Sequence, residues 1–92
     1  MAQETKEKII RKMKDELSAV AVEVVDESWK HAGHAAAGGG GHYILELVSE
    51  RFEGVSLLNR NRMVFDVLKE EIGAEIHALT IKAKTPQEVA KN

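Results

Sequence analysis

Histidine is the residue type in this chain best suited to chemistry, and three of its four copies lie close together. His31, His34 and His42 surround a run of alanine and glycine, while His77 stands apart. Neutral imidazole binds transition metals and exchanges protons near neutral pH. Cysteine is absent, which excludes disulfides, thiolate nucleophiles and cysteine-based zinc sites. Soft-metal chemistry here must therefore use imidazole, or sulfur supplied by another molecule.

Each histidine has a simpler explanation when it is considered alone. A histidine in a polar loop is usually solvated, and the spacing of His31 and His34 suits a metal only on a helical turn, which Gly33 disfavours. His77 falls near the start of an expected strand, where a histidine commonly bonds a neighbouring carbonyl. If His77 shares a sheet end with the loop, however, a fixed imidazole faces a movable one. Two imidazoles are too few for a closed tetrahedral site, so this arrangement favours a metal centre completed by another protein.

The glycine run does not match a phosphate-binding loop. Gly38–Gly41 lead into His42 and an expected strand, whereas such loops lead into a helix and, in the Walker form, a Lys-Ser/Thr pair. The GxxG clamp of KH domains joins two helices, but this run joins two strands. We therefore expect neither nucleotide binding nor a KH-type clamp from these glycines.

The elements that must position the histidines follow from the spacing of apolar residues. Helical spacing predicts an amphipathic helix up to Leu17 and a second from an N-cap at Ser56 to Gly73, with a short helix and bend left open at residues 58–62. Their apolar positions are Ile9, Ile10, Met13, Leu17, Leu57, Val64, Leu68 and Ile72.

Alternation of apolar residues predicts three strands, over residues 19–28, 42–50 and 75–85. Between the first two strands we expect a flexible loop at about residues 27–41, and after Pro86 a frayed tail to residue 92. The expected faces are Val20, Val22 and Val24 in the first strand, and Ile76, Ala78 and Thr80 alternating with His77, Leu79 and Ile81 in the third.

The element order predicts a two-layer α+β domain. A loop between adjacent strands makes an antiparallel hairpin, and the helix before the last strand lets that strand return parallel to a neighbour. Helices then cover one face of a three-stranded mixed sheet. The 92 residues suit one domain, 1–92. No apolar run approaches the ~18 residues of a membrane span, and the first residues match no targeting signal, so we expect a cytoplasmic protein.

Three stretches of the sequence closely resemble the BolA family. They are "VVDESWKHAGH", "HYILELVSERFEGVSLLNRNRMV" and "LKEEIGAEIHALTIKAKTPQE", and the likeness runs from about Leu17 to Glu88. It implies a class II KH-like fold, α-β-β-α(α)-β, in agreement with the order above. The family commonly has Arg-His-Arg where this chain has Arg-Asn-Arg. The most specific pieces are Val48-Ser49 followed by Phe52-x-Gly54, Arg60-x-Arg62, and His77-Ala78-Leu79 leading into Thr85-Pro86.

The resemblance also implies a function, as a non-enzymatic partner of monothiol glutaredoxins. In that family a heterodimer holds a bridging 2Fe–2S cluster, for which glutaredoxin supplies a cysteine and a bound glutathione thiol. Carried over by position, the first histidine ligand is His77. The loop ligand falls best on His34, with His42 and then His31 as alternatives. A chain without cysteine cannot hold such a cluster alone, and two imidazoles should raise its reduction potential relative to four thiolates.

Other functions stay open at this point. Some family members are described as transcription factors, and Arg60, Arg62 and Lys69 in the helical region could contact DNA. The net charge of −2 and the lack of interleaved aromatic residues disfavour this role, which predicts affinity that falls steeply with salt. The chain could also be a protein-binding adaptor with idle histidines. An enzyme is disfavoured, because no nucleophile–base pair or carboxylate dyad stands out.

Overall fold

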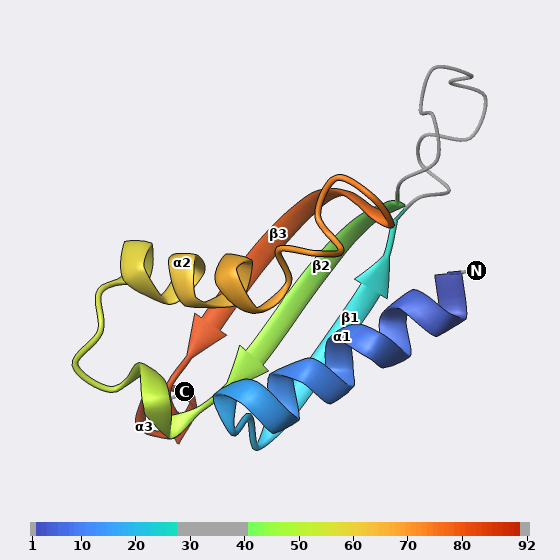
Figure 1. The fold of residues 1–92 in the computed structure, drawn as a ribbon. Helices are drawn as coiled ribbons and strands as arrows, with labels where there is room; N and C mark the ends of the chain where they lie inside the picture. The colour runs from blue at the N-terminus through green and yellow to red at the C-terminus, as the bar shows by residue number, and fades with distance from the viewer. Residues whose placement is uncertain (1, 28–40, 91–92) are drawn as a thin grey trace.

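Helices cover one face of a three-stranded sheet in the computed structural model, which describes residues 2–27 and 41–90 (Figure 1). This arrangement confirms the predicted two-layer α+β architecture. The elements, in chain order, are α1 (Ala2–Leu17), β1 (Ala21–Asp26), β2 (Gly41–Val48), the 3₁₀ helix η3 (Glu50–Phe52), α2 (Leu57–Val67), β3 (Ile76–Lys84) and α3 (Pro86–Ala90).

The sheet has the mixed topology that the element order predicted. Its strand order is β1-β2-β3. β1 and β2 pair antiparallel, from Ala21 opposite Val48 to Asp26 opposite Tyr43. β2 and β3 pair parallel, and the connection between them carries α2 (Figure 1). β2 is therefore central, and β1 and β3 are the two outer strands of the described sheet.

α1 packs on the sheet through the predicted apolar stripe. Ile9 and Met13 are fully buried and Leu17 is almost so, while Ile10 packs at the side of the core. The helix ends at Leu17, whose carbonyl accepts a hydrogen bond from the buried Ser49 hydroxyl. Because a helix leaves its last carbonyls unpaired, Ser49 satisfies one of them and joins α1 to the end of β2.

α2 begins as predicted but ends earlier. The Ser56 side chain accepts from the Asn59 N–H at the N-terminus. The helix ends at Val67, and Gly73 is not its terminal residue but lies in the following turn with a φ of 92°. The helix is continuous over residues 58–62, so the short helix and bend left open there are absent; a separate short helix, η3, lies earlier, at Glu50–Phe52. Leu57, one of the apolar positions from which this helix was predicted, is 70% exposed and lines a groove beside the outer strand β3.

β3 contains an irregularity that its sequence pattern did not predict. Gly41 pairs with Ile76 and His42 pairs with Ala78, so His77 is an extra residue, a β-bulge. The bulge shifts the alternation by one, and the predicted face of Ile76, Ala78 and Thr80 is therefore wrong. The residues of β3 that join Ile76 at the core are Leu79, Ile81 and Ala83, opposite Tyr43, Leu45 and Leu47.

The C-terminal residues form a short helix rather than the expected frayed tail. The Glu88 N–H donates to Thr85 Oγ1 (3.1 Å), and the Thr85 N–H donates to the Glu88 carboxylate (3.0 Å). This reciprocal pair is a capping box, and Pro86 occupies the first helical position, which it favours. The frayed-tail prediction is wrong for Pro86–Ala90, because the capping box fixes this turn. Residues 91–92 lie outside the described residues.

Candidate functional site

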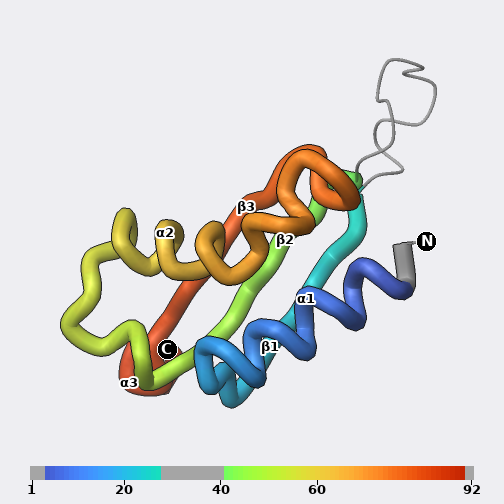
Figure 2. Tube along the Cα trace, viewed as in Figure 1, coloured from blue at the N-terminus to red at the C-terminus, as the bar shows by residue number. Residues whose placement is uncertain are grey.

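His42 and His77 stand at the same end of the sheet. Each is the second residue of its strand, in β2 and β3, and these strands run parallel. Figure 2 shows that β2 and β3 begin where β1 finishes. His42 pairs with Ala78, the residue after His77, and neighbouring strands lie roughly 5 Å apart. The two histidines therefore occupy adjacent strands at one edge of the fold.

The described residues on either side of the segment that carries the other two histidines lie at this same end of the sheet. The Glu27 N–H donates to the His42 carbonyl (2.8 Å), and the Gly41 N–H donates to the Glu75 carbonyl (2.9 Å). Residues 27 and 41 are the described neighbours of residues 28–40. The condition set by the sequence, that His77 shares a sheet end with the loop boundaries, is met. His31 and His34 themselves lie outside the described residues, so their distance from His77 stays a prediction.

The turn before His77 is held against α1 by an ion pair. Lys8 Nζ lies 2.9 and 3.1 Å from the two carboxylate oxygens of Glu75. The Glu75 backbone carbonyl binds Gly41 at the start of β2. One residue therefore connects α1, the start of β2 and the bulged start of β3, which fixes the backbone that carries His77.

His77 is exposed, and the bulge leaves it without a partner residue on β2. Bulges are common beside functional sites, where they redirect a side chain. The His42 side chain is half-buried. Within residues 2–27 and 41–90, no three His, Asp or Glu side chains are grouped so that they could hold a metal ion. The described part of this site thus offers an accessible imidazole, with a second on the neighbouring strand.

Arg60, a candidate DNA contact from the sequence, points into the protein. Its side chain is 8% exposed. Nε donates to the Val55 carbonyl (2.8 Å), Nη1 donates to the Ala83 carbonyl (3.0 Å), and Nη1 and Nη2 bind the Glu88 carboxylate (2.9 and 3.0 Å). The guanidinium also lies 5.9 Å from the centre of the Phe52 ring. Arg60 is therefore not available to a DNA backbone, contrary to that interpretation.

The sequence contains a signal for the position of Glu88 that the predictions did not include. Thr85 and Glu88 are three residues apart around Pro86, which is the spacing of a capping box. The Glu88 carboxylate that closes this box also binds Arg60, from 28 residues earlier in the chain. Arg62 and Lys69, the other two candidate DNA contacts, are exposed.

The ion pair makes the stability of the fold depend on pH in the acidic range. Hydrogen bonds from Arg60, and then from the Thr85 N–H, lower the pKa of Glu88 from 4.5 to about 2. A lowered pKa stabilises the folded chain fully above the unfolded pKa, and this stabilisation is lost as the pH falls from about 4.5 toward 2. We expect the difference in thermal midpoint between wild type and Glu88→Gln to shrink across this range, as followed by circular dichroism. A constant difference would contradict the lowered pKa.

Comparison with protein families finds a match over residues 13–88 to the family described as BolA, BolA-like protein. The chain is 44% identical over 88 residues to SufE-like protein 1, chloroplastic/mitochondrial, of Arabidopsis thaliana. It is 41% identical over 81 residues to Protein BOLA1, chloroplastic, of the same plant. It is 40% identical over 83 residues to the DNA-binding transcriptional regulator BolA of Escherichia coli (strain K12).

These alignments cover 89%, 84% and 90% of this chain, and 24%, 51% and 77% of the relatives. The chain thus spans about a quarter of the first relative and half of the second. Among solved structures, the BolA domain of SufE1 from Arabidopsis thaliana superposes with a TM-score of 0.79 at 42% identity, over 91% of this chain and 94% of that one. BolA1 from Mus musculus gives 0.78 at 39% identity, over 95% and 69%.

Proposed function

Because the chain belongs to the BolA-like protein family, we propose that it is a non-enzymatic partner of a monothiol glutaredoxin. The two proteins share a bridging 2Fe–2S cluster, in iron–sulfur cluster assembly, trafficking or iron regulation. The observation that carries the proposal is the position of His77, exposed on a bulge at the sheet end that also holds residues 27 and 41. An accessible imidazole at this place suits a site that a second protein completes.

The donor atoms of this chain fit one side of such a cluster. Imidazole replaces cysteine on one iron of Rieske-type clusters, with thiolates on the other iron. His77 supplies the first nitrogen, and the second comes from His34, with His42 and then His31 as alternatives. Of these three, His42 is the one among the described residues, on the strand next to His77. The cysteine of glutaredoxin and the thiol of glutathione supply the sulfur ligands that this chain lacks.

A mixing experiment tests the proposal. The protein is added to a monothiol glutaredoxin loaded with a 2Fe–2S cluster and glutathione, and the visible absorption and circular dichroism are recorded. We expect a changed cluster spectrum and a one-to-one complex on size-exclusion chromatography with light scattering. A one-to-one complex with an unchanged spectrum would favour the protein-binding adaptor instead. No complex would reject both functions.

DNA binding is the second candidate function, and the observation that favours it is the name of the Escherichia coli relative. Because Arg60 is buried, contacts would fall on the exposed Arg62 and Lys69. The affinity for duplex DNA should then fall steeply with salt and weaken on Arg62→Ala. An affinity for DNA that changes neither with the salt concentration nor on Arg62→Ala would reject this role.

The cellular compartment stays a proposal. No helix of the described residues is long and apolar enough to cross a membrane. We propose the cytoplasm, as expected from the sequence. The names of the two Arabidopsis thaliana relatives assign those proteins to chloroplasts, and one of them also to mitochondria.

A further inference from the structure

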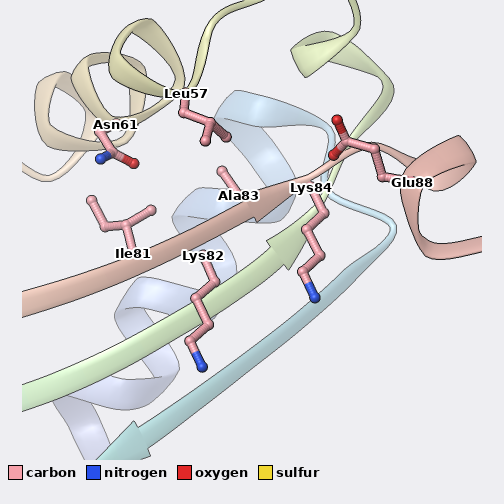
Figure 3. Close-up of a pocket in the computed structure, with 7 residues that line it drawn as sticks. All are labelled: Leu57, Asn61, Ile81, Lys82, Ala83, Lys84 and Glu88. Carbon is pink, nitrogen blue, oxygen red and sulfur yellow. The ribbon is translucent and has the colours of Figure 1, made fainter. Parts of the chain in front are cut away.

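We propose that the outer edge of β3 binds an extended peptide in which apolar and acidic residues alternate. β3 is at one end of the strand order, and no strand of the described residues pairs with its other side. A groove of about 430 Å³ runs along this edge (Figure 3). Its walls come from Leu57 and Asn61 of α2, from residues 81–84 of β3, and from Glu88 of α3, whose carboxylate is paired with Arg60. This surface is separate from the proposed histidine site.

The backbone of β3 presents hydrogen-bonding groups to this groove. The Lys84 carbonyl accepts from the Ser49 N–H, which follows β2, whereas the Ala83 carbonyl accepts from Arg60. Successive residues of a strand point their backbone groups to opposite sides, so Leu79, Ile81 and Ala83 point away from β2. Arg60 occupies the Ala83 carbonyl and closes one end of the edge. The outward N–H and C=O groups of Leu79 and Ile81 can then pair with an added strand.

The side chains beside this edge differ between the two faces of the sheet. Figure 3 shows Leu57, Asn61 and Ile81 on the helix side of β3, and Lys82 and Lys84 pointing to the opposite side. A strand added here would place its own side chains alternately on these two sides. Those on the helix side would meet Leu57, which is 70% exposed, and would have to be apolar to bury it.

The opposite face selects for negative charge. Glu46 lies opposite Lys82 in the β2–β3 register, but its carboxylate binds Lys84 at 3.1 Å. Lys82 is exposed. An acidic residue opposite Lys82 on the added strand would form a cross-strand charge pair. Nucleic acid suits this groove less well, because its helix side is apolar. Charge and shape together therefore favour a peptide with acidic residues on one side and apolar residues on the other.

The test uses two labelled peptides, Thr-Val-Glu-Val-Glu-Val-Thr and its lysine counterpart Thr-Val-Lys-Val-Lys-Val-Thr. Fluorescence anisotropy measures their affinity for the full chain, and amide NMR shifts locate the site. We expect the glutamate peptide to bind more tightly and to shift the amides of Leu79, Ile81 and Ala83. Shifts confined to other residues would overturn the proposal, as would no saturable binding.

Charge reversal gives the sharpest control. Lys82→Glu should weaken binding of the glutamate peptide by about five-fold and strengthen binding of the lysine peptide. Lys14→Glu makes the same change of charge at an exposed residue of α1, outside the groove, and should leave both peptide affinities nearly unchanged. Ile81→Pro removes an outward N–H but no bond to β2, and should abolish binding.

If Ile81→Pro does not fold, as judged by its thermal melt, the charge swap decides the question alone. Equal effects of the two lysine reversals would overturn the proposal. A single-stranded DNA oligonucleotide that shifts the amides of β3, when neither peptide does, would assign the groove to nucleic acid instead.

Discussion

Replacing Arg60 with alanine is expected to lower the free energy of unfolding by about 3 kcal/mol. The substitution leaves the carbonyls of Val55 and Ala83 without the donors that they bind in the native fold. It also removes the charged partner of Glu88, and with it the ion pair between α2 and α3. For a domain of this size the thermal midpoint should fall by roughly 15 °C. Urea unfolding followed by circular dichroism measures the free energy, and thermal melts measure the midpoint.

Arg62→Ala is the matched control for this experiment. Arg62 lies two residues along the same helix but is exposed, so its loss should change stability by no more than about 0.5 kcal/mol. Arg60→Lys keeps the charge without the planar fork that reaches two carbonyls and a carboxylate, so its stability should lie between alanine and wild type. An Arg60→Ala protein that is as stable as wild type but binds DNA less well would restore the DNA-contact interpretation.

The two-layer architecture could be predicted because it depends on local patterns. The stripe of Ile9, Met13 and Leu17 repeats at helical spacing, and all three are in the core. The N-cap at Ser56 was recognised because a hydroxyl there bonds a nearby N–H within the same turn. A loop between the first two strands and a helical connection before the third then restrict how the strands can pair.

The features that were missed depend on contacts between distant residues. Arg60 is buried against Glu88, which lies beyond β3 in the chain. The bulge at His77 is set by the register between β2 and β3, and the composition of β3 alone does not contain that register. Gly73 has the positive φ expected after a helix, but it serves a turn that closes on Ile76. The type of each residue was therefore known from the sequence, whereas its structural role depended on contacts with residues far along the chain.

The candidate site was predictable to the same extent. The strand order alone places His42 and His77 at one end of the sheet, because both open parallel strands. The exposure of His77 follows from the bulge and could not be predicted from the order. His31 and His34 lie outside the described residues. Substitution of His34, His42 and His31 therefore has to identify the second ligand.

Replacing His77 with alanine is expected to abolish the change in cluster spectrum that the proposed function predicts for the wild-type protein with loaded glutaredoxin. The alanine side chain has no donor atom, and one iron would lose a nitrogen ligand that neither glutaredoxin nor glutathione replaces. Fold stability should change little, because the His77 side chain is exposed. Visible circular dichroism of the mixture measures the cluster, and a thermal melt of the variant alone measures the fold.

Three further substitutions separate a ligand role from a general effect on this region. Thr80→Ala changes an exposed residue of the same strand and should leave the spectral change intact. His34→Ala should weaken the spectral change, unless His42 replaces His34 as the second ligand. In that case the combined substitution of His34 and His42 with alanine should remove the spectral change. If His77→Ala matches wild type in the spectrum and in the one-to-one complex, this chain does not ligate the cluster through His77. In that case the exposed bulge would serve only to contact glutaredoxin, because such a contact does not need the imidazole nitrogen of His77.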